Sequence, residues 1–183
     1  MLELIGRMLK IFLPDKSYDN IFEIRLDFVT KKKYIFFDFD NTLMPWGSNN
    51  ISEKIKSLFD DLELKKFRII IVTNGEGDRY RRLKSYLPDG VVLLTNMKKP
   101  NSSKLKKYMK TYDINPQNSV FIGDNLITDI YTANKLGMHT IKVKPIVFKE
   151  FWATKIYRIT EIFLYIIFRK EFKEIYEKSN PIR

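Results

Sequence analysis

The chain has 183 residues, enough for one domain with a good core and some appended segments. Its 44% hydrophobic and 14% aromatic content excludes a disordered chain, and the lack of cysteine excludes disulfides, thiolate metal sites and cysteine catalysis. Because His139 is the single histidine, any metal should be held by oxygen ligands. The net charge of +11 predicts an anionic partner, which could be nucleic acid, an anionic membrane face or a phosphorylated substrate.

The N-terminal residues lack the pattern of a cleavable signal peptide. The longest apolar run, Ile162–Phe168, has seven residues, whereas about 18–20 are needed to span a bilayer. We therefore expect a cytoplasmic protein that is peripheral on the inner face of the membrane and does not cross it.

The first segment, residues 2–13, has the pattern of a short amphipathic helix that ends at Pro14. Two roles are open for it: packing on the domain, or anchoring at a membrane surface. Residues 15–33 have no clear period. The alternation of Phe22, Ile24 and Leu26 with charged residues hints at a short extended piece.

From Tyr34 onward, predicted strands alternate with predicted helices. This alternation indicates an α/β fold: a Rossmann-like parallel sheet with right-handed crossovers and helices on both faces. The expected strands cover about 34–38, 68–73, 91–94, 119–122 and 140–143. The expected helices cover about 51–65 and 78–87, a segment from about 102, and 126–136.

Residues 146–183 form an aromatic and basic tail with helical spacing. It is too apolar for a free tail and too interrupted for a membrane span. The sequence thus divides into an amphipathic helix (1–14), an α/β core (15–145) and a helical tail (146–183). The two ends of the chain could pack on the core, pack on another subunit or dock on anionic lipid. The sequence does not indicate an oligomeric state.

Two carboxylates, Asp38 and Asp40, follow the apolar run Tyr34–Phe37 where the strand leaves the core. Alternation along an extended chain would put both on the same side. Two like charges this close repel unless a cation lies between them or one carboxyl holds a proton. The pair is thus either a chemical site or two acids in a solvated loop.

Other polar residues follow the remaining strands, and the carboxyl ends of parallel strands meet at one edge of the sheet. The sequence therefore predicts one polar site at this edge. Its members are Asp38, Asp40 and Thr42; Thr73, Asn74 and Gly75; Thr95, Asn96, Lys98 and Lys99; and Gly123, Asp124, Asn125, Thr128 and Asp129.

These residue types suit phosphoryl transfer. Asp38, Asp124 and Asp129 offer hard oxygen ligands for Mg²⁺, although Asp129 could instead support a ligand or cap a helix. Asp38 can act as the nucleophile and Asp40 as the acid and base. Thr73 and Asn74 can bind phosphoryl oxygens, and Lys99 can neutralise charge in the transition state.

Arg79 follows the second strand together with Arg81 and Arg82. It could meet an anionic headgroup, which makes it a candidate substrate-binding residue. The alternative is that all three arginines lie on a solvated helix face.

Asp38-Phe39-Asp40-Asn41-Thr42 resembles the first motif of the haloacid dehalogenase (HAD) superfamily of phosphatases. Thr73, Lys99, and Gly123-Asp124 followed by Asp129 resemble its second, third and fourth motifs, in the right order. The resemblance covers about residues 34–145. It implies a Rossmann-like core, dependence on Mg²⁺ and an aspartyl-phosphate intermediate. It also implies that Asp40 gives its backbone carbonyl to the metal, which adds Asp40 to the metal ligands.

The segments between the motifs are too short for a cap domain, which resembles the capless class. Further stretches resemble the bacterial YqeG-type phosphatases, which are related to the mitochondrial phosphatidylglycerophosphate phosphatase of fungi. These stretches are Phe12-Leu13-Pro14-Asp15, Leu43-Met44-Pro45-Trp46, Lys98-Lys99-Pro100 and the run from Gly123 to Ile130.

The resemblance implies that phosphatidylglycerophosphate, an anionic phospholipid, is dephosphorylated to phosphatidylglycerol at the membrane surface. Two alternatives stay open. One is a capless phosphatase acting on nucleic-acid ends or phosphoproteins, and the other is a membrane-associated scaffold without activity.

Overall fold

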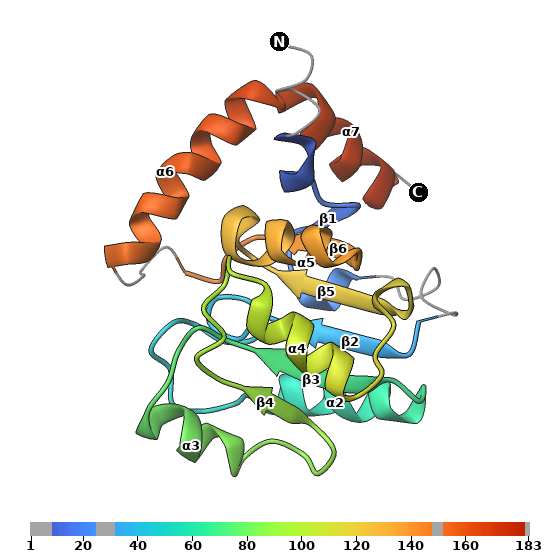
Figure 1. Cartoon of the computed structure of the whole chain (residues 1–183), viewed down its shortest axis with the longest axis vertical. Helices are drawn as coiled ribbons and strands as arrows, with labels where there is room; N and C mark the ends of the chain where they lie inside the picture. Colours follow the sequence, from blue (N-terminus) through green and yellow to red (C-terminus); the bar gives the residue numbers. More distant parts are fainter. Residues whose placement is uncertain (1–8, 25–31, 148–151, 182–183) are drawn as a thin grey trace.

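The computed structural model describes residues 9–24, 32–147 and 152–181, with side chains of the last segment described from Ile159 on. Its centre is a six-stranded, fully parallel sheet in the order β1-β6-β5-β2-β3-β4 (Figure 1). This arrangement confirms the predicted α/β fold. The strands are β1 (Lys16–Tyr18), β2 (Tyr34–Phe37), β3 (Arg68–Val72), β4 (Val92–Leu94), β5 (Ser119–Gly123) and β6 (His139–Val143).

Both faces of the sheet are buried, because helices cover each of them. Neighbouring residues of each central strand point to opposite faces. On one side Ile35 and Phe37 pack with helices α2 (Glu53–Leu64) and α3 (Asp78–Lys84). On the other side Phe36 packs with α4 (Ser103–Thr111) and α5 (Tyr131–Leu136). This explains why the strands read as continuous apolar runs.

The described residues also form short helical turns: η1 (Lys10–Phe12), η2 (Ile21–Glu23), η4 (Pro116–Asn118) and η5 (Leu126–Ile130). The helix predicted over 126–136 has two parts, since η5 is a π-helical turn and only α5 is α-helical. The prediction of an extended piece is wrong at Phe22, which lies in the 3₁₀ turn η2; Ile24 after it is extended, and Leu26 lies outside the described residues.

The N-terminal segment packs on the core where it is described. The Phe12 and Tyr131 rings stack with centroids 4.9 Å apart, and the Asn134 amide donates to the carbonyls of Ile11 and Leu13. Residues 1–8 of the predicted helix lie outside the described part of the chain.

Strand β1 was not predicted, because three residues are too few to show a period. It pairs with β6 and forms one edge of the sheet. Helix α7 (Arg169–Ser179) covers this edge. The Ser179 hydroxyl accepts the Ser17 N–H at 3.0 Å, and the Asn180 amide donates to the Ser17 carbonyl at 3.0 Å. The tail thus satisfies backbone groups that an open edge would expose.

The preceding helix, α6 (Trp152–Ile167), lies beside η5 and meets α7 at Phe168 (Figure 1). Leu164 and Phe168 are buried against Leu126, Ile127 and Ile130. Within the described residues, no helix has the length and apolar character needed to cross a membrane.

The order of the strands locates the expected site. The chain runs outward from β2 through β3 to β4, and then returns to the other side of β2 to form β5 and β6. β2 and β5 therefore flank the point where the direction of winding reverses. Ligands bind at such switch points in open α/β sheets, outside the carboxyl ends of the strands.

Candidate active site

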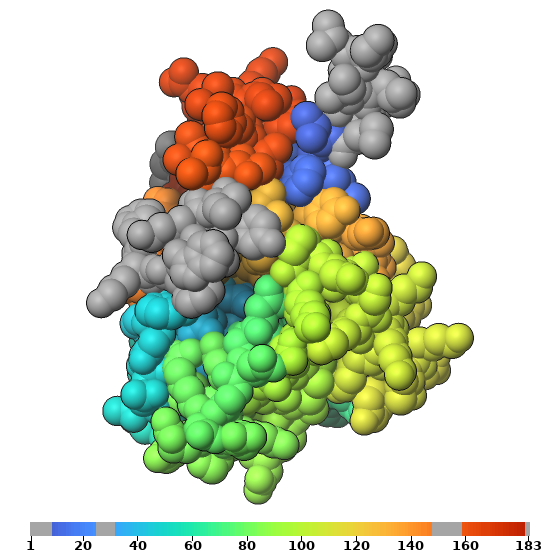
Figure 2. All heavy atoms as spheres, turned by 60° about the vertical axis from the view of Figure 1, so that its left-hand side comes forward, coloured from blue at the N-terminus to red at the C-terminus, as the bar shows by residue number. Residues whose placement is uncertain are grey.

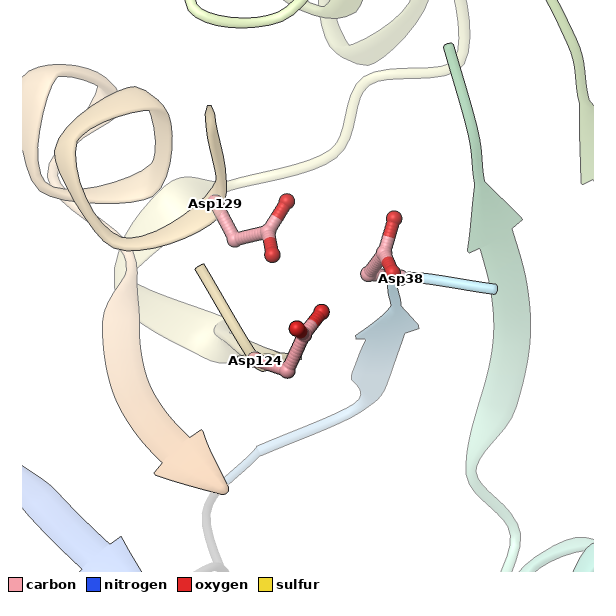
Figure 3. A group of neighbouring side chains, drawn as sticks. All are labelled: Asp38, Asp124 and Asp129. Atoms are coloured by element: carbon pink, nitrogen blue, oxygen red, sulfur yellow. The ribbon is translucent and has the colours of Figure 1, made fainter. Parts of the chain in front are cut away.

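Three carboxylates meet at this switch point (Figure 3). Asp38 follows β2, Asp124 follows β5, and Asp129 comes from η5. One oxygen of each lies within 4.8 Å of the others, and all three residues are buried. A buried group of oxygen ligands at this spacing is suited to a hard divalent cation.

Lys99, which follows β4, lies inside the same cluster. Its Nζ donates to Asp38 Oδ1 at 2.7 Å and to Asp129 Oδ1 at 2.7 Å. A third bond, to the Val72 carbonyl at 2.9 Å, fixes the ammonium at the end of β3. Lys99 therefore links the ends of β2 and β3 to η5 and places a positive charge beside Asp38.

The charges of the cluster do not balance. Burial raises the pKa of Asp38 well above its usual range; the Lys99 ammonium opposes this rise, and Asp129 and Asp124 add to it. Burial lowers the pKa of Lys99, but the charges of Asp129 and Asp38 outweigh burial and raise it overall. Three buried carboxylates around one ammonium leave a net negative charge that a bound cation would balance.

The loop after β5 is built to bring Asp129 to this position. A Cβ on Gly123 would lie 2.5 Å from the Asp129 Cβ, so the approach requires glycine. Asp129 Oδ2 accepts the Asn125 N–H at 3.0 Å, and Asn125 Oδ1 accepts the N–H groups of Ile127 and Thr128. Asn125 thus caps the start of η5 and fixes the turn that brings in Asp129.

Asn41 shapes the loop after β2 in a similar way. It adopts a left-handed conformation (φ 67°), which asparagine tolerates better than most residues. Its Oδ1 accepts the Trp46 N–H, and its backbone N–H donates to the Met44 carbonyl. The turn carries Thr42 back toward β5, where its hydroxyl donates to Asp124 Oδ1 at 3.3 Å.

Asp40 lies outside the three-carboxylate cluster and has its own partners. Arg79 Nη2 lies 2.8 Å from Asp40 Oδ1, and the Tyr80 hydroxyl donates to Oδ2 at 2.6 Å. Burial and the neighbouring Asp40 raise the pKa of Tyr80, so its hydroxyl stays a donor. The two carboxylates of the first motif therefore have separate environments, one facing the cluster and one held by α3.

For Arg79 the alternative of a solvated helix face is wrong. Its guanidinium also donates to the Ser48 carbonyl and the Tyr80 hydroxyl, so it is occupied within the protein. Arg81 and Arg82 are exposed, as that alternative expected. A direct contact between Arg79 and substrate stays a prediction and would require a rearrangement of its pair with Asp40.

The structure also places Thr73 and Asn74 near the cluster. Thr73 is buried, and its hydroxyl accepts the Gly75 N–H at 3.0 Å. The Asn74 side chain accepts the Lys99 N–H at 2.6 Å and donates to the Lys99 carbonyl at 2.7 Å. Asn74 therefore positions Lys99, and its predicted contact with phosphate is untested.

Sequence reasoning missed two residues that support this site. One is Tyr80, which packs so closely on Gly75 that any Cβ there would lie 1.8 Å from the Tyr80 hydroxyl. The glycine after the second predicted strand was the one sequence feature that indicated such a close neighbour. The other is Glu161 of α6, which is 3% exposed and accepts the Leu126 N–H beside the cluster. Glu161 lies in a helical segment with no recognisable motif, so its contact could not be predicted.

Comparison with known proteins assigns the family. The HAD-hydrolase-like family model matches residues 96–162, which include Lys99, Asp124 and Asp129. The probable phosphatase YqeG of Bacillus subtilis is 30% identical over 154 residues, which cover 83% of this chain and 88% of YqeG. The glyceraldehyde 3-phosphate phosphatase of Pyrococcus furiosus is 38% identical over 48 residues, 26% of this chain and 20% of that enzyme.

Among solved structures, an uncharacterized protein from Listeria monocytogenes serotype 4b superposes with a TM-score of 0.53. The match covers 65% of this chain and 84% of that protein at 15% identity, so it supports the fold alone. The similarity to YqeG and the HAD-like match agree with the buried carboxylates at the switch point. The chain belongs to the HAD phosphatase family, among the relatives of YqeG.

Proposed function

We propose that this protein is a Mg²⁺-dependent phosphomonoesterase that works through an aspartyl-phosphate on Asp38. The observation that carries the proposal is the placement of Asp38, which shares the Lys99 ammonium with Asp129 and lies within 4.8 Å of both other carboxylates. Asp38, Asp124, Asp129 and the Asp40 carbonyl would hold the metal, which when bound would neutralise the phosphate and orient it for attack.

In the first step a carboxylate oxygen of Asp38 attacks phosphorus. The new bond joins Asp38 to the phosphoryl group, and the bond from phosphorus to the ester oxygen breaks. Asp40 gives its proton to that oxygen, which leaves as the alcohol. Lys99 stabilises the charge on the phosphoryl oxygens from its position beside Asp38.

In the second step water attacks the same phosphorus, and Asp40 takes its proton. The bond between phosphorus and Asp38 breaks, which releases inorganic phosphate and restores both aspartates. The contacts of Tyr80 and Arg79 would keep the Asp40 side chain in place through both steps.

For the substrate we propose phosphatidylglycerophosphate, cleaved to phosphatidylglycerol at the inner membrane face. Three features support a lipid phosphomonoester: the motif resemblance to YqeG-type phosphatases, the net charge of +11, and the short connections around the site. Between β2 and β3 the chain holds only the loop 38–52, α2 and a short turn, and between β3 and β4 the largest element is α3. Neither connection holds a cap domain that would exclude a bulky substrate.

The test compares phosphate release from three substrates at equal phosphate concentration: liposomes containing phosphatidylglycerophosphate, a 3′-phosphorylated DNA end, and a small soluble phosphomonoester. We expect Mg²⁺-dependent release, fastest from the lipid. Fast cleavage of the soluble ester without cleavage of the lipid would overturn the lipid assignment. Preference for DNA would favour the nucleic-acid alternative, and no release from any substrate would favour the scaffold.

The metal proposal has an independent readout. Chelation should abolish hydrolysis, and Mg²⁺ should restore it. Mg²⁺ should also raise the midpoint of thermal unfolding, because a ligand that binds only the folded state stabilises it. Asp124→Asn should remove this thermal shift, whereas Asp89→Asn, at an exposed position, should keep it. An unchanged shift in Asp124→Asn would show that Mg²⁺ binds elsewhere.

A further inference from the structure

The outer face of α6 is an exposed apolar surface that no described residue covers. Ile159, Ile162, Phe163, Ile166 and Ile167 recur at the spacing of one helix face, and each is more than half exposed. Tyr165 is not part of this stripe, because its ring packs on Phe172 of α7 with centroids 4.4 Å apart. Single exposed apolar side chains are common, but a contiguous stripe of this kind marks an interaction surface.

The opposite face of the same helix is fixed to the core. Leu164 and Phe168 are buried against η5, and Glu161 accepts the Leu126 N–H. The apolar residues described from Ile159 to Phe168 therefore divide into two sets, and packing on the core accounts for only one. Figure 2 shows the described part of α6 standing out from the body of the molecule, where its outer face is accessible to a binding partner.

The charges around the stripe indicate the kind of partner. From Ile159 to Phe168 the one charged residue is Glu161, and it is buried on the core side. Arg169 and Lys170 follow directly and are exposed, and the sequence of α6 carries Lys155 and Arg158 before the stripe. A second copy packed on this face would bring basic ends together, whereas an anionic surface would complement them.

We propose that the outer face of α6 seats the protein on an anionic bilayer. The stripe would enter the boundary between headgroups and acyl chains, and the basic residues at its ends would meet anionic headgroups. The aromatic side chain of Phe163, which is 60% exposed, suits that interface. The inference rests on the proposed function, since it names the surface from which a lipid substrate would reach the site.

The position of α6 relative to the metal cluster supports this role. The buried face of α6 contacts η5, the segment that carries Asp129. Because a helix with its side chains is about 10 Å across, the exposed face lies on the order of 10 Å from that segment. The proposed docking surface is therefore carried by the helix that packs against the segment holding Asp129.

The experiment measures vesicle binding without substrate. Wild type should co-sediment with vesicles of phosphatidylglycerol and phosphatidylcholine, more weakly as salt is raised. The double variant Phe163→Glu/Ile166→Glu should bind at least about tenfold more weakly, because it replaces two apolar side chains with charge. Leu64→Glu is the matched control: Leu64 is 81% exposed on α2, and its replacement should leave binding unchanged.

A labelling experiment tests the same face directly. The chain has no cysteine, so a single one can carry an environment-sensitive fluorophore. A label on Ile166→Cys should shift to the blue when vesicles are added, and a label on Leu64→Cys should not. Equal shifts at both positions, or wild-type binding by the double variant, would overturn the proposal. A wild-type dimer that the double variant converts to a monomer, without vesicle binding by either, would assign the face to a second copy.

Failure of this inference can be told from failure of the proposed function. Vesicle binding through α6 without hydrolysis of phosphatidylglycerophosphate would refute the substrate and leave the docking surface. Hydrolysis of that lipid in detergent micelles, by a protein that ignores vesicles, would refute the surface and leave the enzyme. Neither α6 variant touches the cluster, so hydrolysis of a soluble ester should be unchanged in both.

Discussion

The catalytic edge of the sheet and the helical tail each place a buried carboxylate on the segment 125–130. Asp129 accepts the N–H of Asn125 and turns toward Lys99. Glu161 comes from α6 and accepts the next N–H along the chain, that of Leu126. The two acids bind neighbouring backbone groups of the same segment, but only Asp129 belongs to the carboxylate cluster. The comparison indicates that the edge of the sheet supplies the reacting groups, whereas the tail stabilises the segment that carries one of them.

The largest effect should come from the catalytic edge. Asp38→Asn removes the nucleophile and should lower kcat/KM by more than about 10⁴-fold, because the covalent step cannot occur. Circular dichroism should show a retained fold. Asp89→Asn, at an exposed position, is the control and should be fully active. An active Asp38→Asn enzyme would disprove the covalent mechanism.

A smaller loss should follow from moving Asp129 without changing it. The Cβ of Gly123→Ala would lie 2.5 Å from the Asp129 Cβ, so the loop must shift. A shift of about 1 Å can reduce the rate about 10²-fold, and we expect a loss of this size in kcat together with weaker Mg²⁺ binding. Gly47→Ala is the control for backbone strain without a clash, since its φ of +81° disfavours any side chain but a Cβ there meets nothing within 4 Å. Near wild-type kcat in Gly123→Ala would show that Asp129 need not approach this closely.

The contact of Asp40 with Tyr80 should contribute less. Tyr80→Phe removes a hydrogen bond to a carboxylate, which contributes about 1.5–3 kcal/mol. If it positions Asp40 in the transition state, kcat should fall roughly tenfold to a hundredfold while KM changes little. Tyr86→Phe, at an exposed tyrosine that follows α3, should be neutral. A rise in KM alone would instead place Tyr80 in substrate binding.

The tail should give the smallest effect on chemistry. Glu161→Ala leaves the buried Leu126 N–H without this acceptor, which should lower the free energy of unfolding by about 1–3 kcal/mol. Denaturant unfolding measures the change, with the exposed Glu174→Ala as the control. Turnover of a soluble ester should stay near wild type. A loss of kcat as large as that of Gly123→Ala would contradict the division between the two regions.

Much of the core was predictable because local sequence determined it. Tyr34–Phe37 is an apolar run of strand length, and polar residues at successive strand ends must meet at one edge of a parallel sheet. The positions of Asp38, Lys99 and Asp124 after successive strands therefore predict that they lie together, as they do in the structure. The three-residue strand β1 and the π turn at Leu126–Ile130 were not predicted, because neither has a period long enough to read.

Contacts between distant residues were also out of reach. Tyr80 meets Asp40 across 40 positions, and Glu161 meets Leu126 across 35. The sequence of the tail showed an amphipathic character but not which apolar residues face the core. Only the structure separates Leu164, which is buried, from Ile166, which is 67% exposed.

The bond between Glu161 and the Leu126 N–H has a thermodynamic consequence for the proposed roles. If metal binding orders the segment that begins at Leu126, it also favours the packing of α6 on that segment. By thermodynamic linkage, whatever stabilises α6 in this position favours metal binding to the same extent. Seating α6 on a bilayer would then raise the affinity for Mg²⁺, and Mg²⁺ would raise the affinity for the bilayer. A single buried hydrogen bond would thus couple the binding of the bilayer to the binding of the metal.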